Sequence, residues 1–258
     1  MNLTPSQADV WFRAVLPLVA DLADRDLFVL PPFTAIPLAR ARLSGSRIAW
    51  GAQDVHPDDA GAHTGDVSAP MLADLGCRYV EVGHSERRRD HGETSALIGA
   101  KLRAILRWGM TPILCVGETV ALAADEAIPV VLADLGACVD GLSAEEVGRL
   151  VVAYEPAWAI GEGAIAAPAD RVGAVQRALA AWLAERTDRG PRANGHGAER
   201  RPVPILYGGS VDEVAAGRLL AEPGVDGLFV GRYALDPERF ARIARARPLV
   251  VGTEDGTS

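Results

Sequence analysis

Lysine is almost absent from this 258-residue chain. Lys101 is the only lysine among 26 basic side chains, and all the others are arginine. An enzyme that works through a lysine Schiff base needs this side chain at its reacting centre. Lys101 lies in a segment with helical spacing, away from any predicted strand end. The sequence therefore argues against a Schiff-base aldolase.

Cysteines are few, and long apolar runs are missing. Cys77, Cys115 and Cys138 are an odd number without metal-ligand spacing, and two of them lie in apolar runs. We expect reduced thiols and a cytoplasmic protein. Charged residues interrupt the N-terminal segment, so it does not resemble a secretory signal. No run is long enough to predict a membrane span.

Positive charge is also in deficit. The formal net charge is -8, with 34 acidic against 26 basic side chains. This balance argues against nucleic acid and anionic membranes as partners. It is compatible with an anionic substrate, because backbone N–H groups can build a local phosphate site.

Helical and strand-like patterns alternate along the whole chain, which begins with a helix. Repeated strand–helix units predict an α/β fold with a parallel sheet and helices outside. We expect a single domain, residues 1–258, forming a TIM (β/α)8 barrel that lacks its first β-strand. The alternative, an open doubly wound sheet, lacks a G-x-G-x-x-G after an early strand. The predicted strands are Leu27–Leu30, Ile48–Ala52, Tyr79–Val82, Pro112–Val116, Val151–Tyr154, Val203–Tyr207 and Gly227–Val230.

The predicted helices occupy the segments between these strands. Polar residues 187–201 predict a flexible, solvated insertion, and residues 253–258 predict a frayed tail. The predicted helices are Pro5–Ala23, Ala35–Leu43, Pro70–Leu75, Glu93–Trp108, Thr119–Leu135, Ser143–Arg149, Pro168–Arg186, Glu213–Ala221 and Asp236–Arg245.

The segment Ala153–Gly163, A-Y-E-P-A-W-A-I-G-E-G, places Glu155 directly after a strand-like run. A carboxylate at the exit of a buried strand is costly unless it has a partner or a function. The following proline and glycine-rich tip are typical of a moving lid. The pattern therefore fits proton abstraction from a small substrate. It fits equally a surface acid at an ordinary turn.

A second cluster, V-E-V-G-H-S-E-R-R, places His84 between a strand and a helical region. The N-terminus of a helix disfavours the imidazolium, so a histidine there can stay neutral and donate an N–H to a carbonyl. A single histidine can equally be structural. Ser85 and Glu86 fit either a hydrogen-bonded support for His84 or a helix cap with a surface ion pair.

Two further glycine-containing segments end the last two predicted strands. Tyr207-Gly208-Gly209-Ser210 precedes a helix, where glycines and a serine can cradle an anion. Gly231-Arg232 follows the last strand. Either segment alone fits an ordinary turn, but at the ends of the last two strands of a barrel they match a recurrent phosphate site.

Taken together and in order, these segments resemble the triosephosphate isomerase family over nearly the whole chain. The matching text is G-A-Q-D-V-H and T-G-D-V-S-A-P-M-L within Gly51–Leu72, G-H-S-E-R-R at Gly83–Arg88, G-E-T at Gly92–Thr94, T-P-I-L-C-V-G-E at Thr111–Glu118, Ala153–Gly163, I-L-Y-G-G-S-V at Ile205–Val211 and D-G-L-F-V-G at Asp226–Gly231.

The resemblance implies an aldose–ketose isomerase of glycolysis and gluconeogenesis that interconverts dihydroxyacetone phosphate and glyceraldehyde 3-phosphate through an enediolate. Glu155 would move the proton between C1 and C2, and neutral His84 would polarise the carbonyl. In this family such an acid–base pair is tuned by its surroundings and enclosed by a closing lid. Ser85 and Glu86 would support the catalytic pair.

The resemblance also assigns the substrate's phosphate and the partners. The phosphate would bind at Gly161, Ser210, Gly231 and Arg232. The segment 54–66 with Thr64 would contact a second copy in a homodimer. Neither metal nor organic cofactor is implied. His56 and His63 with nearby aspartates suggest a metal site, but an interface loop is the preferred interpretation.

The chain departs from the family pattern in three places. The family's first strand, with its Asn-x-Lys motif, is not in this sequence, and we expect the natural start to lie upstream of Met1. Arg232 stands where the family usually has glycine, and its guanidinium would lie either near the place of the missing lysine or against the phosphate. The lid reads Gly161–Ala164, G-E-G-A, in place of the frequent G-T-G-K. Two alternatives follow: a tetrulose-phosphate isomerase of the same family, or a catalytically impaired phosphate-binding barrel.

Overall fold

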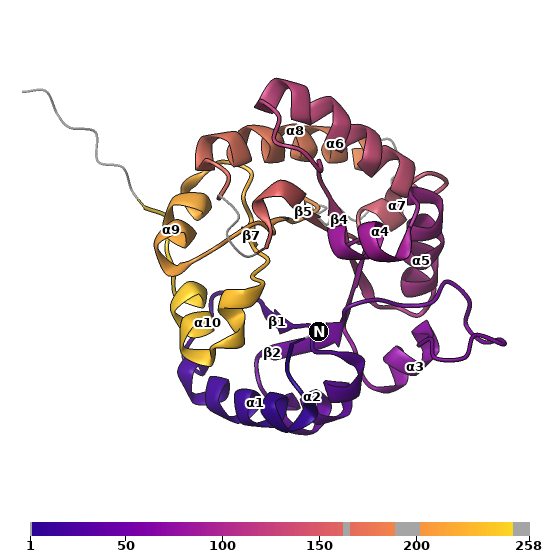
Figure 1. Cartoon of the computed structure of the whole chain (residues 1–258), viewed down its shortest axis with the longest axis vertical. Coiled ribbons are helices and arrows are strands. Elements are labelled where there is room, and N and C mark those ends of the chain that lie inside the picture. The colour runs from indigo at the N-terminus through magenta and orange to yellow at the C-terminus, as the bar shows by residue number, and fades with distance from the viewer. Residues whose placement is uncertain (1, 162–165, 189–201, 250–258) are drawn as a thin grey trace, which may run out of the picture.

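The computed structural model describes residues 2–161, 166–188 and 202–249. In these residues seven parallel strands form one curled sheet in sequential order, surrounded by helices (Figure 1). Each strand is paired in parallel with its neighbour in sequence. The predicted α/β barrel-type fold is thereby confirmed. The strands are β1 (Leu27–Val29), β2 (Ile48–Ala52), β3 (Tyr79–Val82), β4 (Thr111–Val116), β5 (Val151–Tyr154), β6 (Ile205–Tyr207) and β7 (Gly227–Leu228).

The helices form the outer layer around the sheet (Figure 1). The first helix begins with a capping box: the Thr4 hydroxyl accepts from the Gln7 N–H at 3.4 Å, and the Gln7 amide oxygen accepts from the Thr4 N–H at 2.9 Å. The helices are α1 (Pro5–Val19), α2 (Ile36–Leu43), α3 (Ala69–Asp74), α4 (Ser85–His91), α5 (Ser95–Arg107), α6 (Ala124–Cys138), α7 (Ala144–Val147), α8 (Ala169–Asp188), α9 (Glu213–Ala221) and α10 (Pro237–Ala244), with short 3-10 turns η1 (Phe33–Ala35), η2 (Ala157–Ala159) and η3 (Arg232–Leu235).

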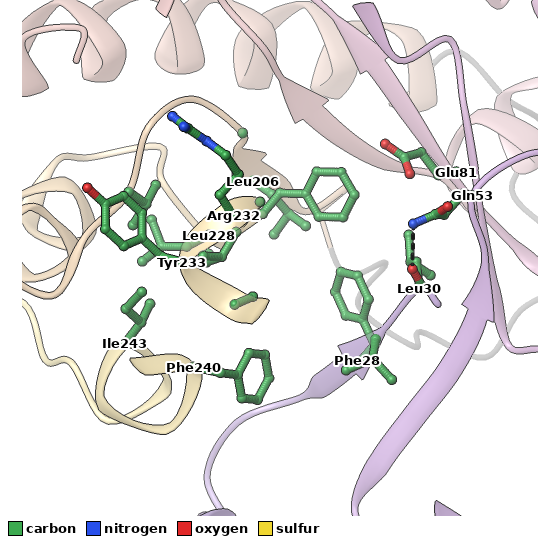
Figure 2. Close-up of a pocket in the computed structure, with 18 of the residues that line it drawn as sticks. Phe28, Leu30, Gln53, Glu81, Leu206, Leu228, Arg232, Tyr233, Phe240 and Ile243 are labelled. Atoms are coloured by element: carbon green, nitrogen blue, oxygen red, sulfur yellow. Dashed lines mark hydrogen bonds between the residues drawn. The ribbon is translucent and has the colours of Figure 1, made fainter. Parts of the chain in front are cut away.

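The edges of the sheet are β1 and β7, which do not pair with each other in the described residues. Aromatic rings meet across this opening, since Phe28 and Phe229 stack with ring centroids 6.0 Å apart. Beside them lies a cavity of about 1080 Å³, part of which is drawn in Figure 2. The Gln53 side chain donates to the Leu30 carbonyl at 2.9 Å, so the chain just beyond β1 is held to the segment after β2.

Several element boundaries differ from the sequence-based expectation. Helix α4 was not among the predicted helices, although a helical region was expected after His84, and Gly92 ends it with a left-handed φ of 65°. Helix α6 begins at Ala124, not at Thr119, and the Glu126 carboxylate accepts from the Ala123 N–H at 3.2 Å there. Strand β7 ends two residues early, at Leu228, just before the chain turns into η3.

Some predictions fall on residues outside the described ranges. These are the lid residues Glu162–Ala164, most of the predicted insertion and the tail Thr253–Ser258. Thr187 and Asp188, which the prediction placed in the insertion, instead continue α8. Within the described residues, no helix is both long enough and apolar enough to span a membrane.

Candidate active site

The predicted site residues gather around one cavity at the carboxyl ends of the strands. His84 follows β3, and Glu155 follows β5. The cavity is lined by seven of the eight predicted residues, namely His84, Glu86, Glu155, Gly161, Ser210, Gly231 and Arg232; Ser85 is absent from the lining. The carboxyl ends of barrel strands are where this architecture places its reacting groups.

Glu155 is a buried carboxylate, with only 3% of the residue exposed. Its backbone N–H donates to the Val116 carbonyl at 2.8 Å, which extends the pairing of β4 with β5 by one residue. Burial raises the pKa of the Glu155 carboxyl, and the nearby His84 and the Ser85 N–H oppose this rise. A raised pKa makes a carboxylate a stronger base near neutral pH.

His84 faces this base directly. Its Nε2 lies 3.5 Å from Glu155 Oε1. As the N-cap of α4, its Nδ1 accepts from the Glu86 N–H at 3.2 Å. A neutral imidazole whose Nδ1 accepts a hydrogen bond carries its proton on Nε2. The arrangement therefore points a neutral N–H donor and a carboxylate base toward the same space.

The predicted phosphate-binding segments meet at the same cavity. The Arg232 guanidinium donates to the Gly161 carbonyl, joining η3 to the first residue of the lid. The Ser210 N–H donates to the Ala159 carbonyl at 3.2 Å, so this amide is engaged with η2. A phosphate that binds the Ser210 N–H must displace this bond.

Comparisons with known proteins show which family the chain belongs to. A sequence model of the triosephosphate isomerase family matches residues 1–247. The triosephosphate isomerase of Thermus thermophilus is 44% identical over 246 residues, covering 95% of this chain and 94% of the relative. The chain belongs to the triosephosphate isomerase family. It is accordingly an isomerase of the triosephosphate isomerase type.

Two further relatives extend this match. The triosephosphate isomerase of Roseiflexus sp. is 43% identical over 250 residues, covering 96% of this chain and 95% of the relative. The crystal structure of triosephosphate isomerase from Bartonella henselae superposes with a TM-score of 0.77 at 31% identity, covering 94% of this chain and 93% of that one. Both sequence and backbone therefore match the triosephosphate isomerase family over nearly the whole chain.

A hydrogen-bonded group that the sequence analysis missed supports the start of the lid. Buried Glu118 accepts from the indole N–H of Trp158 at 2.8 Å and lies 3.2 Å from the hydroxyl of Tyr154. Arg171 of α8 donates to both Glu118 and Tyr154. The sequence did contain a signal for this group. Glu118, the last residue of T-P-I-L-C-V-G-E, is an acid that follows a buried strand, as Glu155 is.

A second missed group surrounds Lys101, which is buried in α5. Its Nζ lies 2.6 Å from both Asp54 Oδ1 and Glu93 Oε1. Arg87 of α4 completes a four-membered network, at 2.8 Å from Asp54 and 2.6 Å from Glu93. The network fastens α4, which presents His84, to α5 and to the segment after β2.

Among the residues that the structure describes, two clusters have ligand atoms close enough together to suggest a metal: His56, Asp58 and His63, and Glu81, His84 and Glu155. In each cluster a histidine Nδ1 accepts a backbone N–H, His56 from Asp58 and His84 from Glu86. The Nε2 of such a neutral ring carries the proton and has no lone pair for a metal. In a metal-bound histidine, by contrast, the ring nitrogen that does not bind the metal donates a hydrogen bond. The residues of both clusters therefore fit hydrogen bonding better than metal ligation.

Close packing against Glu155 yields a testable prediction. A Cβ added at Gly208 would lie 2.8 Å from Glu155 Cγ and 3.2 Å from Oε1. Gly208→Ala is therefore expected to displace the carboxylate and to lower kcat by up to about 100-fold, the cost of a misplacement of about 1 Å. The matched control is Gly136→Ala, whose Cβ would meet nothing nearer than 3.6 Å. Steady-state kinetics that show equal activity for both variants would contradict the prediction.

Proposed function

We propose that this chain interconverts dihydroxyacetone phosphate and glyceraldehyde 3-phosphate by proton transfer through an enediolate. The observation that carries the proposal is the 3.5 Å approach of His84 Nε2 to buried Glu155 Oε1. Glu155 takes a proton from one substrate carbon and returns it to the neighbouring carbon. His84 donates its Nε2–H to the substrate oxygens, on which negative charge develops.

Arg232 supports a phosphorylated substrate. Of the three arginines that line the cavity, Arg25 is paired with Asp24, and Arg87 with Asp54 and Glu93. Arg232 has only the Gly161 carbonyl as a hydrogen-bond partner among the described residues. Its charge is therefore available to a phosphate, together with the backbone at Gly161, Ser210 and Gly231.

Arg232→Ala is expected to raise KM on the order of 10-fold to 100-fold and to change kcat less. A charge-assisted hydrogen bond contributes about 1.5–3 kcal/mol, and binding lost equally from substrate and transition state appears in KM. The matched control is Arg239→Ala, because Arg239 is half-exposed and lies over the Tyr233 ring instead. An unchanged KM in Arg232→Ala would show that this guanidinium does not hold the phosphate.

The experiment that tests the function is a coupled assay of the purified chain with dihydroxyacetone phosphate and, separately, with a tetrulose phosphate. We expect a higher kcat/KM for the triose phosphate. A higher value for the tetrulose phosphate would assign the chain to the second substrate. Phosphate binding without turnover of either would assign it to the impaired barrel.

We further propose a cytoplasmic homodimer, joined through the segment 54–66. The rings of His56 and His63 stack in this segment with centroids 3.9 Å apart, while Thr64 at its tip is exposed. An exposed loop whose side chains pack on one another in this way is suited to contact a second copy of the chain. Sedimentation of the wild type and of Thr64→Arg tests this: a dimer that the substitution converts to monomer is expected. A monomeric wild type would contradict it.

A further inference from the structure

Glu81 is a buried acid to which the proposed reaction assigns no part. It lies on β3, with 7% of the residue exposed, and its carboxyl points into the cavity (Figure 2). Its one hydrogen-bond partner among the described residues is the Cys115 thiol, with Sγ 3.6 Å from Oε1. A thiol is a weak donor, so the carboxyl is poorly compensated for its removal from water.

The proposed base, Glu155, lies close to Glu81. Ligand atoms of Glu81, His84 and Glu155 all lie within 4.8 Å of one another. Within the described ranges, neither carboxylate forms an ion pair with an arginine or lysine. The basic side chains nearby are engaged elsewhere: Lys101 and Arg87 bind Asp54 and Glu93, and Arg232 binds the Gly161 carbonyl.

Two buried carboxyls at this separation cannot both ionise easily, so the pair retains a proton. Glu155 is the better placed to be the ionised member. The Ser85 N–H donates to its Oε2 at 3.5 Å, and the His84 Nε2–H faces its Oε1. Glu81 has the thiol alone. Burial and, next, the charge of Glu155 raise the pKa of Glu81 well above its ordinary value.

We propose that Glu81 is a positioning residue that acts through Glu155: it stays protonated while Glu155 is ionised, and loss of its proton at alkaline pH stops the isomerase. This rests on the proposed function. Once Glu81 ionises, a second negative charge lies beside the base. That charge disfavours both the phosphate dianion and the enediolate, whose negative charge develops in the same space.

The groups around Glu81 leave this charge uncompensated. Those that face it are Cys115 of β4, Glu155 after β5, His84 and Glu86 at the start of α4, and Asp54 after β2. Four of these five are acids or a thiol, and His84 is held as a neutral donor by the Glu86 N–H. Deprotonation of Glu81 therefore adds to a field that is already negative.

The test is the pH dependence of kcat/KM for the wild type and Glu81→Gln, each scaled to its own value at pH 7. We expect the wild type to fall about tenfold per pH unit above the pKa of Glu81, as one ionisation requires. In Glu81→Gln this fall is expected to disappear or to move upward by more than one pH unit. Glu81→Asp keeps a titratable group and is expected to keep the fall.

Two controls separate this from other causes. Glu238→Gln changes an exposed glutamate, 72% exposed at the side chain, and is expected to leave the profile unmoved. Cys115→Ala removes the other titrating group beside Glu155 and is expected to retain the alkaline fall. A fall at the same pH in wild type and Glu81→Gln would overturn the proposal, as would its loss in Cys115→Ala.

A second measurement does not need turnover. Because the folded pKa of Glu81 is raised, its contribution to stability is complete below about pH 4.3, the ordinary value for glutamate. It is then lost as pH rises toward the folded pKa. The Tm of Glu81→Gln minus that of wild type should therefore grow from acid to neutral pH. A Tm difference that does not change with pH would overturn the proposal for Glu81, even if the chain turned over no sugar phosphate. A Tm difference that grows with pH in an inactive chain would refute the proposed function but not the protonation of Glu81.

Discussion

Glu155→Gln is expected to lower kcat by about 100-fold to 10,000-fold, the usual contribution of a positioned general base. The amide occupies nearly the same volume at the end of β5, but it cannot accept a proton from the substrate carbon. KM is expected to change much less, because in the proposed function the phosphate is held elsewhere, by Arg232 and the neighbouring backbone. Steady-state kinetics at pH 7 measure both constants separately.

The matched control is Glu145→Gln, which makes the same substitution at an exposed position of α7. This variant is expected to keep the wild-type kcat. Folding of Glu155→Gln is checked by its Tm, which should not fall, since the substitution removes a buried charge. A kcat for Glu155→Gln within threefold of wild type would remove Glu155 from the role of base.

Lys101→Met is expected to lower the free energy of unfolding by about 3–5 kcal/mol at pH 7, the cost of removing one partner from a buried ion pair. The Lys101 side chain is 4% exposed and lies between Asp54 and Glu93. Without it, Arg87 alone remains to compensate two carboxylates. Urea unfolding of the two proteins measures the difference.

Arg107→Met provides the comparison on the same helix. Its guanidinium pairs with Asp59 but is half-exposed, so a loss of about 0–1 kcal/mol is expected. The pKa of Glu93 is lowered by Lys101 and Arg87 against the effect of burial, so its stabilisation is present above the ordinary pKa and is lost as pH falls. The difference in the free energy of unfolding between wild type and Lys101→Met should therefore become smaller as the pH falls. Equal losses in the two variants would contradict the account.

The strands were the most predictable part of the fold. Strands β2, β3 and β5 begin and end where their patterns placed them, as does α9. Each of these strands is a short, mostly apolar run, as expected for a parallel sheet that is covered on both faces. Element ends were less predictable: the helix expected from Glu93 begins at Ser95, because the Thr94 side chain caps it by accepting from the Leu97 N–H.

Local sequence patterns could not predict contacts between residues that lie far apart in the sequence. Lys101 was expected on an outer helix, and it is there, but its burial depends on Asp54, 47 positions away. The Arg232 bond to Gly161 joins residues 71 positions apart. Spacing along the chain carries no information about such pairs, whereas Glu155 and His84 could be identified because each ends a strand.

The role of Glu81 was missed for a related reason. In V-E-V-G-H the acid alternates with two valines, and alternation alone places it on the opposite face of the strand, where an acid can meet solvent. Its environment comes from β4 and from Glu155, which the sheet brings alongside. A buried acid that breaks a local rule beside a reacting group is where a functional constraint is expected.

The central claim is that Glu155 carries a proton between two substrate carbons, with His84 as its neutral partner. The most direct test is to run the conversion of dihydroxyacetone phosphate in D₂O and to follow the product by NMR. The account predicts that C2 of glyceraldehyde 3-phosphate carries either the protium that Glu155 moved from C1 or deuterium that Glu155 took up from the solvent before returning it. With Glu155→Gln, the rate at which this product appears is expected to fall at least 100-fold. Product that forms at the wild-type rate with Glu155→Gln would contradict it.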